Sequence, residues 1–269
     1  MVESAFMKRE KGPEMRFQGK NVIVTGASSG IGLAAASVFL EQGASVLITS
    51  RNSEELSGVQ SSLSEKYPGK VHSFAADVSS ETDWAATVAF ALSQLTSIDV
   101  LVNNAGIGFR GTVLETDVAT WDKLFSINVR GAFLGCRSVL PHMISRGSGA
   151  IVNVSSVAGH EIAMASRAAY VSTKGALNSM TKSLAIDHSA QGIRINAVAP
   201  GTTDSPYFQK FSPDMGNLED YRKMLANRQL MKRMADPREI GLAIAWLASD
   251  EASFCTGTIL DVDGGWSVW

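Results

Sequence analysis

Three side chains in the middle of the chain have the chemistry of a proton-transfer site. Tyr170 and Lys174 are four residues apart, so they share one face of a predicted helix, and an ammonium group beside a phenol favours the phenolate. The pKa of a free tyrosine is about 10, and each unit by which it falls requires about 1.4 kcal/mol. Ser156 precedes them and offers a hydroxyl to a substrate oxygen. The stretch predicts a proton donor, a cation that lowers its pKa and a group that polarises a carbonyl.

The elements that must position this set follow from the hydrophobic pattern. Residues 150–154 form an apolar run typical of a buried strand, Ser156 follows its end, and a helical pattern extends through Leu177 to Ile186. Other predicted strands are 20–25, 45–50, 71–76, 98–102, 193–198 and 258–262, and further predicted helices are 33–42, 54–67, 82–95, 121–143, 218–227 and 237–249. This alternation predicts a parallel sheet with helices on both faces.

A glycine-rich turn joins the first predicted strand to the first predicted helix. Its residues include Gly26, Ser28, Ser29, Gly30, Ile31 and Gly32. Glycines let the backbone approach a pyrophosphate, and a helix N-terminus presents free N–H groups and a favourable dipole. The turn therefore predicts a dinucleotide site, with a purely structural turn as the alternative.

The end of the second predicted strand bears on which nicotinamide cofactor the chain binds. Dinucleotide folds that prefer NAD usually carry an acid there, which bonds the adenosine ribose. This chain has Ser50 and Arg51 instead. A guanidinium suits the 2′-phosphate of NADP, and a hydroxyl of Ser28 or Ser29 can add a bond. We predict NADP(H) over NAD(H), with a merely solvated Arg51 as the alternative.

Residues 17–269 read as one domain, without an internal repeat or a low-complexity tract. Residues 1–16 are polar and charged and predict a disordered tail, with a partner-binding arm as the alternative. The stretch from 202 to 233 is polar and long for a connection. We therefore expect it to carry one or two helices and to act as a lid over the substrate.

Composition argues against several classes of protein. The chain has 269 residues, of which 45% are hydrophobic and 19% charged, and this suits one globular domain with a sizeable core. The net charge is −2 with scattered Lys and Arg, which argues against a nucleic-acid surface, and no apolar run is long enough to cross a bilayer. The two cysteines and four histidines form no metal-spaced cluster, so we expect no metal site and a reducing, cytoplasmic location.

Taken together, the motifs resemble the full set of the short-chain dehydrogenase/reductase family. The resemblance covers residues 17–269, and it rests on the order and spacing of the motifs. They are Thr25-Gly26-x-x-x-Gly30-x-Gly32, Asp77, Asn103-Asn104-Ala105-Gly106, Asn128, Ser156, Tyr170-x-x-x-Lys174 and Pro200-Gly201. The resemblance implies a three-layer, doubly wound Rossmann fold with one seven-stranded parallel sheet. It also implies a nicotinamide cofactor and hydride exchange with a carbonyl or secondary alcohol.

The resemblance implies a role for each matching residue. Tyr170 would be the acid and base, and Lys174 would hold the nicotinamide ribose and lower the tyrosine pKa. Ser156 would hold the substrate oxygen, with Ser155 as the alternative because the spacing to the tyrosine is one residue longer than in many members. Asn128 would support a water that links the lysine to solvent. The implied cofactor contacts are Gly26, Ser28, Ser29, Gly30, Ile31, Gly32, Ser50, Arg51, Asp77, Val78, Asn104, Ala105, Gly106, Tyr170, Lys174, Pro200, Gly201, Thr203 and Ser205.

The C-terminal part has a narrower resemblance, to the cytosolic type 2 3-hydroxybutyrate dehydrogenase group. It rests on Pro200-Gly201-Thr202-x-Asp204-Ser205-Pro206, Arg228-Gln229, Arg233 and Gly264-Gly265-Trp266-Ser267. It implies a small carboxylate held by Arg167 and Arg228, although that group has an acid where this chain has Ser50 and Arg51. Between Ser156 and Tyr170, the polar residues His160 and Glu161 are further candidate substrate contacts.

Several alternatives stay open at this level. Glu161 could neutralise an arginine, which would favour a sugar or polyol over a hydroxy acid; a 3-oxoacyl reductase is another enzyme alternative, and Arg167 could be a plain surface residue. A non-catalytic nucleotide-binding scaffold would not need the complete Asn-Ser-Tyr-Lys set, and a methyltransferase would leave the proton-transfer set unexplained.

The apolar residues Trp266, Val268 and Trp269, together with the family resemblance, predict a homotetramer.

Overall fold

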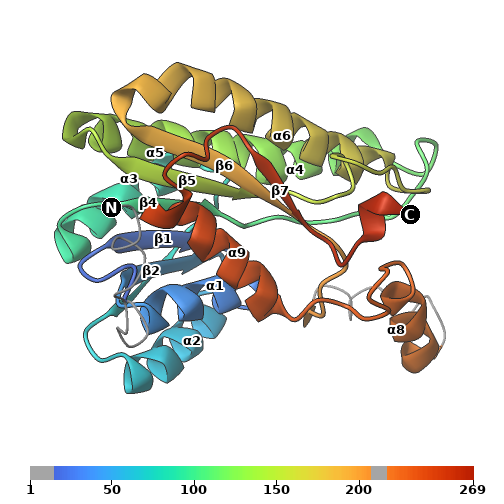
Figure 1. The fold of residues 1–269 in the computed structure, drawn as a ribbon, viewed down its shortest axis with the longest axis horizontal. Helices are drawn as coiled ribbons and strands as arrows, with labels where there is room; N and C mark the ends of the chain where they lie inside the picture. Colours follow the sequence, from blue (N-terminus) through green and yellow to red (C-terminus); the bar gives the residue numbers. More distant parts are fainter. Residues whose placement is uncertain (1–14, 207–216) are drawn as a thin grey trace, which may run out of the picture.

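The computed structural model describes residues 15–206 and 217–269 (Figure 1). Most of the predicted tail, at 1–14, and part of the predicted lid, at 207–216, lie outside the described residues. Within the described ranges, no helix is long and apolar enough to cross a membrane.

The seven strands of the described residues lie in one sheet and run parallel, in the order β3-β2-β1-β4-β5-β6-β7. The strands are β1 (Asn21–Thr25), β2 (Ser45–Ser50), β3 (Val71–Ala75), β4 (Val100–Asn103), β5 (Gly149–Val154), β6 (Ile193–Pro200) and β7 (Ile259–Val262). The prediction of a doubly wound, seven-stranded parallel sheet is confirmed. The predicted strand ends shift by only one or two residues, and β6 runs on to Pro200 because that residue still pairs with Val262 of β7.

Helices cover both faces of the sheet (Figure 1). One layer contains α1 (Gly30–Glu41), α2 (Ser53–Lys66) and α9 (Pro237–Ala248), and the other contains α3 (Glu81–Leu95), α4 (Val118–Phe125), α5 (Gly131–Arg146) and α6 (Ala168–His188). Alternating residues of β1 show how both faces are buried. Val22 and Val24 belong to the core on the α1 and α9 side, whereas Ile23 belongs to the core on the α3 and α5 side. A separate helix, α8 (Leu218–Ala226), lies beyond the carboxyl ends of the strands (Figure 1).

The single helix predicted at 121–143 is wrong in one respect, because a π-helical turn interrupts it. The turn, η1 (Ser126–Arg130), separates α4 from α5. Wide turns of this kind occur mostly inside α-helices and often at functional sites. Asn128 lies in it and is buried, with 2% of its surface exposed. The wider turn accommodates the Asn128 side chain between the loop after β4 and helix α6.

Candidate active site

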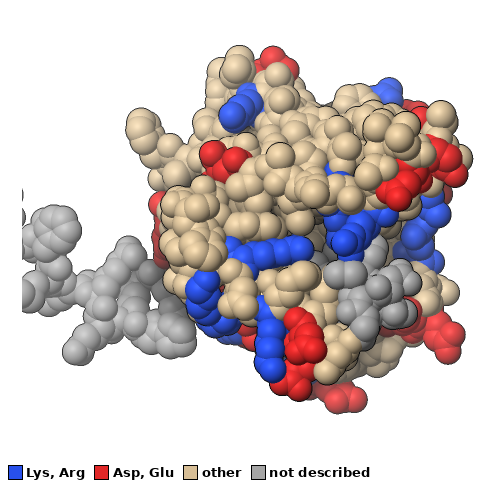
Figure 2. Space-filling view, turned by 90° about the vertical axis from the view of Figure 1, so that its right-hand side faces the viewer, with Lys and Arg blue, Asp and Glu red and all other residues tan. Residues whose placement is uncertain are grey.

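A cavity of about 310 Å³ lies at the carboxyl ends of the strands. Open parallel sheets bind ligands at this edge, and the volume suits a small-molecule site. Figure 2 shows Lys and Arg side chains gathered on this side of the molecule. The lining includes Gly26, Ser29, Gly30, Ile31, Asn104, Ala105, Gly106, Ser155, Ser156, Met164, Arg167, Tyr170, Lys174, Pro200, Gly201, Thr202, Thr203, Ser205, Arg228 and Trp266. The cavity thus brings together most of the residues predicted from the sequence.

The glycine turn after β1 is packed so closely that a side chain at Gly32 has no room. A Cβ there would lie 2.4 Å from the Gly26 carbonyl oxygen and 2.5 Å from Asn104 Nδ2. Asn104 Nδ2 donates to the carbonyl oxygens of Thr25 (2.9 Å) and Gly26 (3.1 Å). The Thr25 hydroxyl accepts in return from the Asn104 backbone N–H (3.0 Å). The turns after β1 and β4 are therefore fixed to each other.

The N-terminus of α1 has the donor chemistry of a pyrophosphate site. Helices α2, α3, α4, α8 and α9 each have an N-cap side chain that accepts a hydrogen bond from a first-turn N–H. Ser29, the N-cap of α1, makes no such bond, so the first-turn N–H groups have no side-chain cap. Ser29, Gly30 and Ile31 all line the cavity. These features fit the pyrophosphate of a dinucleotide cofactor.

The proton-transfer set lies at the start of α6. Lys174 Nζ is 5.8 Å from the centre of the Tyr170 ring, and both residues line the cavity. Lys174 Nζ donates to the Val154 carbonyl oxygen (2.8 Å), and burial lowers the Lys174 pKa from 10.5 to about 8. Buried Ser155 directs its hydroxyl to the Lys174 carbonyl oxygen (3.5 Å), whereas the Ser156 hydroxyl accepts from a backbone N–H two residues later (3.2 Å). This arrangement favours Ser156 over Ser155 as the hydroxyl that faces a substrate.

Asn128 connects the π-helical turn to both neighbouring segments. Its Oδ1 accepts from the Ile107 backbone N–H, and its Nδ2 donates to the Ile107 carbonyl oxygen (2.8 Å each). Nδ2 also donates to the Thr173 hydroxyl (3.0 Å), which itself donates to the Tyr170 carbonyl oxygen (2.7 Å). No motif identified Thr173, and its place between Tyr170 and Lys174 was the only available signal. Asn128 and Thr173 therefore hold the first turn of α6 in position.

The predicted adenosine contacts lie beside the cavity rather than in its lining. Ser50 is the last residue of β2 and Arg51 follows it, and Asp77 and Val78 come shortly after the end of β3, the strand that pairs with β2. Arg51 is exposed. Burial raises the pKa of Asp77, but hydrogen bonds from Ser79 and the charges of Arg51 and Arg130 outweigh it and hold that pKa below its usual value. Arg51 thus lies close enough to Asp77 for its charge to act on that carboxyl group.

Two arginines also line the cavity. Arg167 and Arg228 line it, and Arg167 Nη1 donates to the Phe109 carbonyl oxygen (3.1 Å). Burial lowers the pKa of Arg228; Tyr221 partly offsets this, and the like charges of Arg167 and Arg110 lower the pKa further. Arg110 is not among the residues predicted from the sequence, and Met164 and Trp266 were not predicted to line the cavity. Arg110 and Met164 belong to no motif, and the motif that contains Trp266 does not indicate that its side chain reaches the cavity.

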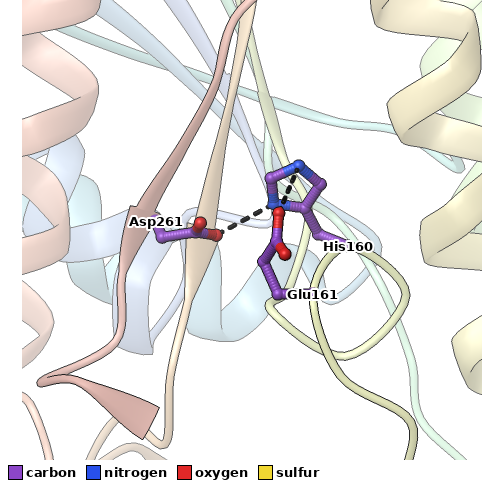
Figure 3. Close-up of side chains that lie close together, drawn as sticks. All are labelled: His160, Glu161 and Asp261. Carbon is purple, nitrogen blue, oxygen red and sulfur yellow. Dashed lines mark hydrogen bonds and ion pairs between the residues drawn. The ribbon is translucent and has the colours of Figure 1, made fainter. Parts of the chain in front are cut away.

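His160 and Glu161 contact each other and a residue of β7. Neither is among the residues that line the cavity. His160 Nδ1 is 3.0 Å from Asp261 Oδ1 of β7, and its Nε2 is 3.4 Å from Glu161 Oε1 (Figure 3). The ligand-type atoms of the three residues lie within 4.8 Å of one another. Carboxylates of the chain engage both ring nitrogens, and the contact with Asp261 joins the loop after β5 to β7. A substrate contact by His160 or Glu161 stays a prediction.

Comparison with known proteins agrees with this geometry. The family model described as enoyl-(acyl carrier protein) reductase matches residues 26–267. The chain is 42% identical to 2-(R)-hydroxypropyl-CoM dehydrogenase of Xanthobacter autotrophicus, over 91% of this chain and 97% of that protein. It is 40% identical to cis-4-hydroxycyclohexanecarboxylate dehydrogenase of Sinomonas cyclohexanicum, over 93% and 98%. It is 37% identical to cyclopentanol dehydrogenase of Comamonas testosteroni, over 94% and 98%.

These matches span nearly the whole chain, and each relative is named as a dehydrogenase of a hydroxy compound. The strand order and the cavity match what the motifs imply. The scaffold and methyltransferase alternatives are therefore set aside. The chain belongs to the short-chain dehydrogenase/reductase family and is an NAD(P)-dependent enzyme that acts on CH–OH groups.

Proposed function

We propose that the protein transfers a hydride between NADP(H) and a small hydroxy acid or keto acid, with Tyr170 as the acid and base. The observation that carries the substrate class is the charge of the cavity. Arg167 and Arg228 line it, Arg228 is half-buried, and the charges of Arg167 and Arg110 act on it. Cations that share a partly buried site favour an anionic ligand.

The residues around Tyr170 support proton transfer in both directions. The bound nicotinamide supplies or accepts the hydride. In oxidation, the Tyr170 phenolate takes the proton of the substrate hydroxyl, and in reduction the phenol returns it to the carbonyl oxygen. The Ser156 hydroxyl holds that same oxygen. Lys174, with a pKa of about 8, is cationic at neutral pH and favours the phenolate by its charge.

The placement of Glu161 bears on the alternatives. Glu161 engages His160 and not an arginine, so the structure offers no support for the idea that it neutralises the arginine pair in favour of sugars or polyols. One relative is named for a carboxylate and another for cyclopentanol, an uncharged alcohol. The relatives therefore allow both classes, and the arginines favour the first. A 3-oxoacyl reductase would likewise have to place an uncharged acyl chain beside them.

The preference for NADP(H) rests on the adenosine end. Ser50 stands where an acid would bond the ribose 2′-hydroxyl, and Arg51 follows it with its side chain exposed. A charged hydrogen bond contributes about 1.5–3 kcal/mol, which corresponds to roughly ten- to hundredfold in affinity.

The substrate class can be tested with 3-hydroxybutyrate and its methyl ester, which share the reacting carbon and differ in charge. Arg228→Ala should lower kcat/KM for the acid roughly thirtyfold and leave the ester within about threefold. Arg238→Ala is the matched control, because that arginine is exposed and paired with Glu41. Equal losses on acid and ester would remove the carboxylate proposal and leave sugars, polyols and acyl substrates.

We also propose that the chain forms a homotetramer. Apolar side chains remain exposed on the single chain, among them Trp121 and Phe133 (40% and 46% exposed) on α4 and α5, and Val268 and Trp269 (75% and 65%) near the C-terminus. Association would cover such surfaces. Light scattering at micromolar concentration tests this, and a monomer would refute it.

A further inference from the structure

Two tryptophans hold opposite ends of Arg228. Trp269 Nε1 donates to the Arg228 carbonyl oxygen (2.9 Å), and the Arg228 guanidinium carbon lies 5.3 Å from the centre of the Trp266 ring. Lys232 Nζ lies 4.0 Å from the centre of the Trp269 ring, which adds a second contact between the same two segments. One tryptophan therefore fixes the backbone of Arg228, and the other faces its charge.

The C-terminal turn that carries these tryptophans is itself tightly built. The Asp263 carboxylate accepts from the backbone N–H groups of Gly265 (2.9 Å) and Ser267 (2.7 Å). Gly265 has a φ of +83°, and a Cβ there would lie 2.8 Å from Leu230 Cδ1. The turn therefore meets the segment after Arg228 at close range, and this geometry requires a glycine.

The other side of Arg228 is anchored to the body of the domain. Gln229 is 1% exposed, accepts from the Thr202 backbone N–H (3.3 Å) and donates to the Leu225 carbonyl oxygen (2.8 Å). Arg228 thus sits between a buried amide and the C-terminal turn. Because Arg167 and Arg110 repel its guanidinium, a less constrained side chain at Arg228 would turn away from the cavity toward water.

We propose that Trp266 and Trp269 are positioning residues for Arg228 and so set how tightly the cavity holds an anionic substrate. They leave the cofactor site and the proton transfer unaffected. This inference rests on the proposed recognition of an anion by Arg228. It assigns a role in specificity to the turn at 263–269, of which only Trp266 reaches the cavity.

The test uses Trp269→Phe, which keeps an aromatic ring for Lys232 and removes the N–H donor together with part of the indole. KM for 3-hydroxybutyrate should rise roughly fivefold, while its kcat, both constants for the methyl ester and the dissociation constant for NADPH stay within twofold. Trp266→Leu, which keeps apolar bulk without the π face, should shift the same KM in the same direction. An unchanged KM for the acid, or equal changes for acid and ester, would overturn the inference.

A double variant separates this inference from the proposed function. In the Arg228→Ala background, Trp269→Phe should have no further effect on the acid, because the residue that it positions is gone. Additive losses would show that Trp269 acts by another route and would overturn the inference alone. If Arg228→Ala does not discriminate between acid and ester, the proposed substrate class fails, and the inference fails with it.

Discussion

The two walls of the cavity are held in different ways. The nucleotide wall (Gly26, Ser29–Ile31 and Asn104–Gly106) is made of backbone at the ends of β1 and β4, locked by the Asn104 amide and by close packing around Gly32. The arginine wall (Met164, Arg167, Arg228 and Trp266) is made of side chains from three separate segments.

This difference separates what each wall can control. A backbone cradle presents the same donors to any cofactor of one class, so changes in it should affect every substrate alike. Long charged side chains respond to the charge of the ligand, so changes in the arginine wall should discriminate between substrates. Tyr170 and Lys174 of α6 line the same cavity, and we expect their loss to affect all reactions most strongly.

Lys174→Met should have the largest effect of the variants that do not discriminate between substrates. It removes the cation beside Tyr170 and the proposed contact to the nicotinamide ribose, so we expect kcat/KM to fall roughly a thousandfold for acid and ester alike, with weaker NADPH binding. Lys182→Met, an exposed lysine of the same helix, is the control. Unchanged nicotinamide affinity would contradict the dual role of Lys174.

The same variant makes a prediction about stability and pH. The pKa of Lys174 falls from 10.5 to about 8 by burial, so below pH 8 folding must bury a charge, and this costs about 3 kcal/mol. Between pH 8 and 10.5 the unfolded chain binds a proton that the folded chain does not, so this cost disappears as the pH rises. Without cofactor, Lys174→Met should therefore be the more stable protein at pH 7, by a margin that shrinks toward pH 10. A margin that does not depend on pH in urea unfolding would refute this.

Gly32→Ala should break the nucleotide wall. The added Cβ would meet a backbone oxygen at 2.4 Å, which cannot move without shifting the turn after β1. We expect NADPH affinity to fall roughly a hundredfold, and activity to fall with every substrate alike. Gly58→Ala is a matched control: that glycine is in α2 with open space around it, and the change should stabilise the helix by about 0.5–1 kcal/mol. Normal NADPH affinity in Gly32→Ala would mean that the turn tolerates the shift.

Arg51→Ala should lower the affinity for one of the two cofactors only. NADPH affinity should fall roughly ten- to hundredfold while NADH affinity changes little. Fluorescence titration of both cofactors measures this directly. If the wild type favours NADH, or if both affinities fall equally, Arg51 is a solvated cation and the NADP(H) preference is wrong.

His160→Ala should have the smallest effect. It removes the hydrogen bond to Asp261 and loosens the loop that carries Ser156, so we expect kcat/KM to fall about two- to fivefold for acid and ester alike. Cofactor affinity should not change. A loss of a hundredfold or more, selective for one substrate, would support His160 as a substrate contact.

Regular elements and motif residues could be predicted from the sequence because their signals are local. The strand pattern placed Ser156 and the glycine turn at strand ends, and parallel strands bring those ends to one edge of the sheet. The π-helical turn could not be predicted, because it depends on bonds between Asn128 and Ile107, which is 21 residues away. The contacts of His160 with Asp261 and of Trp269 with Arg228 span 101 and 41 residues. Contacts between residues so far apart do not produce a periodic pattern in the sequence.

The central claim is that Tyr170 transfers the proton while other residues bind the cofactor. Tyr170→Phe removes the hydroxyl and keeps the ring, so the measurement is NADPH affinity and turnover of acetoacetate in the same purified variant. We expect an unchanged dissociation constant and a fall in kcat of roughly a thousandfold or more. Turnover within tenfold of the wild type would contradict the account.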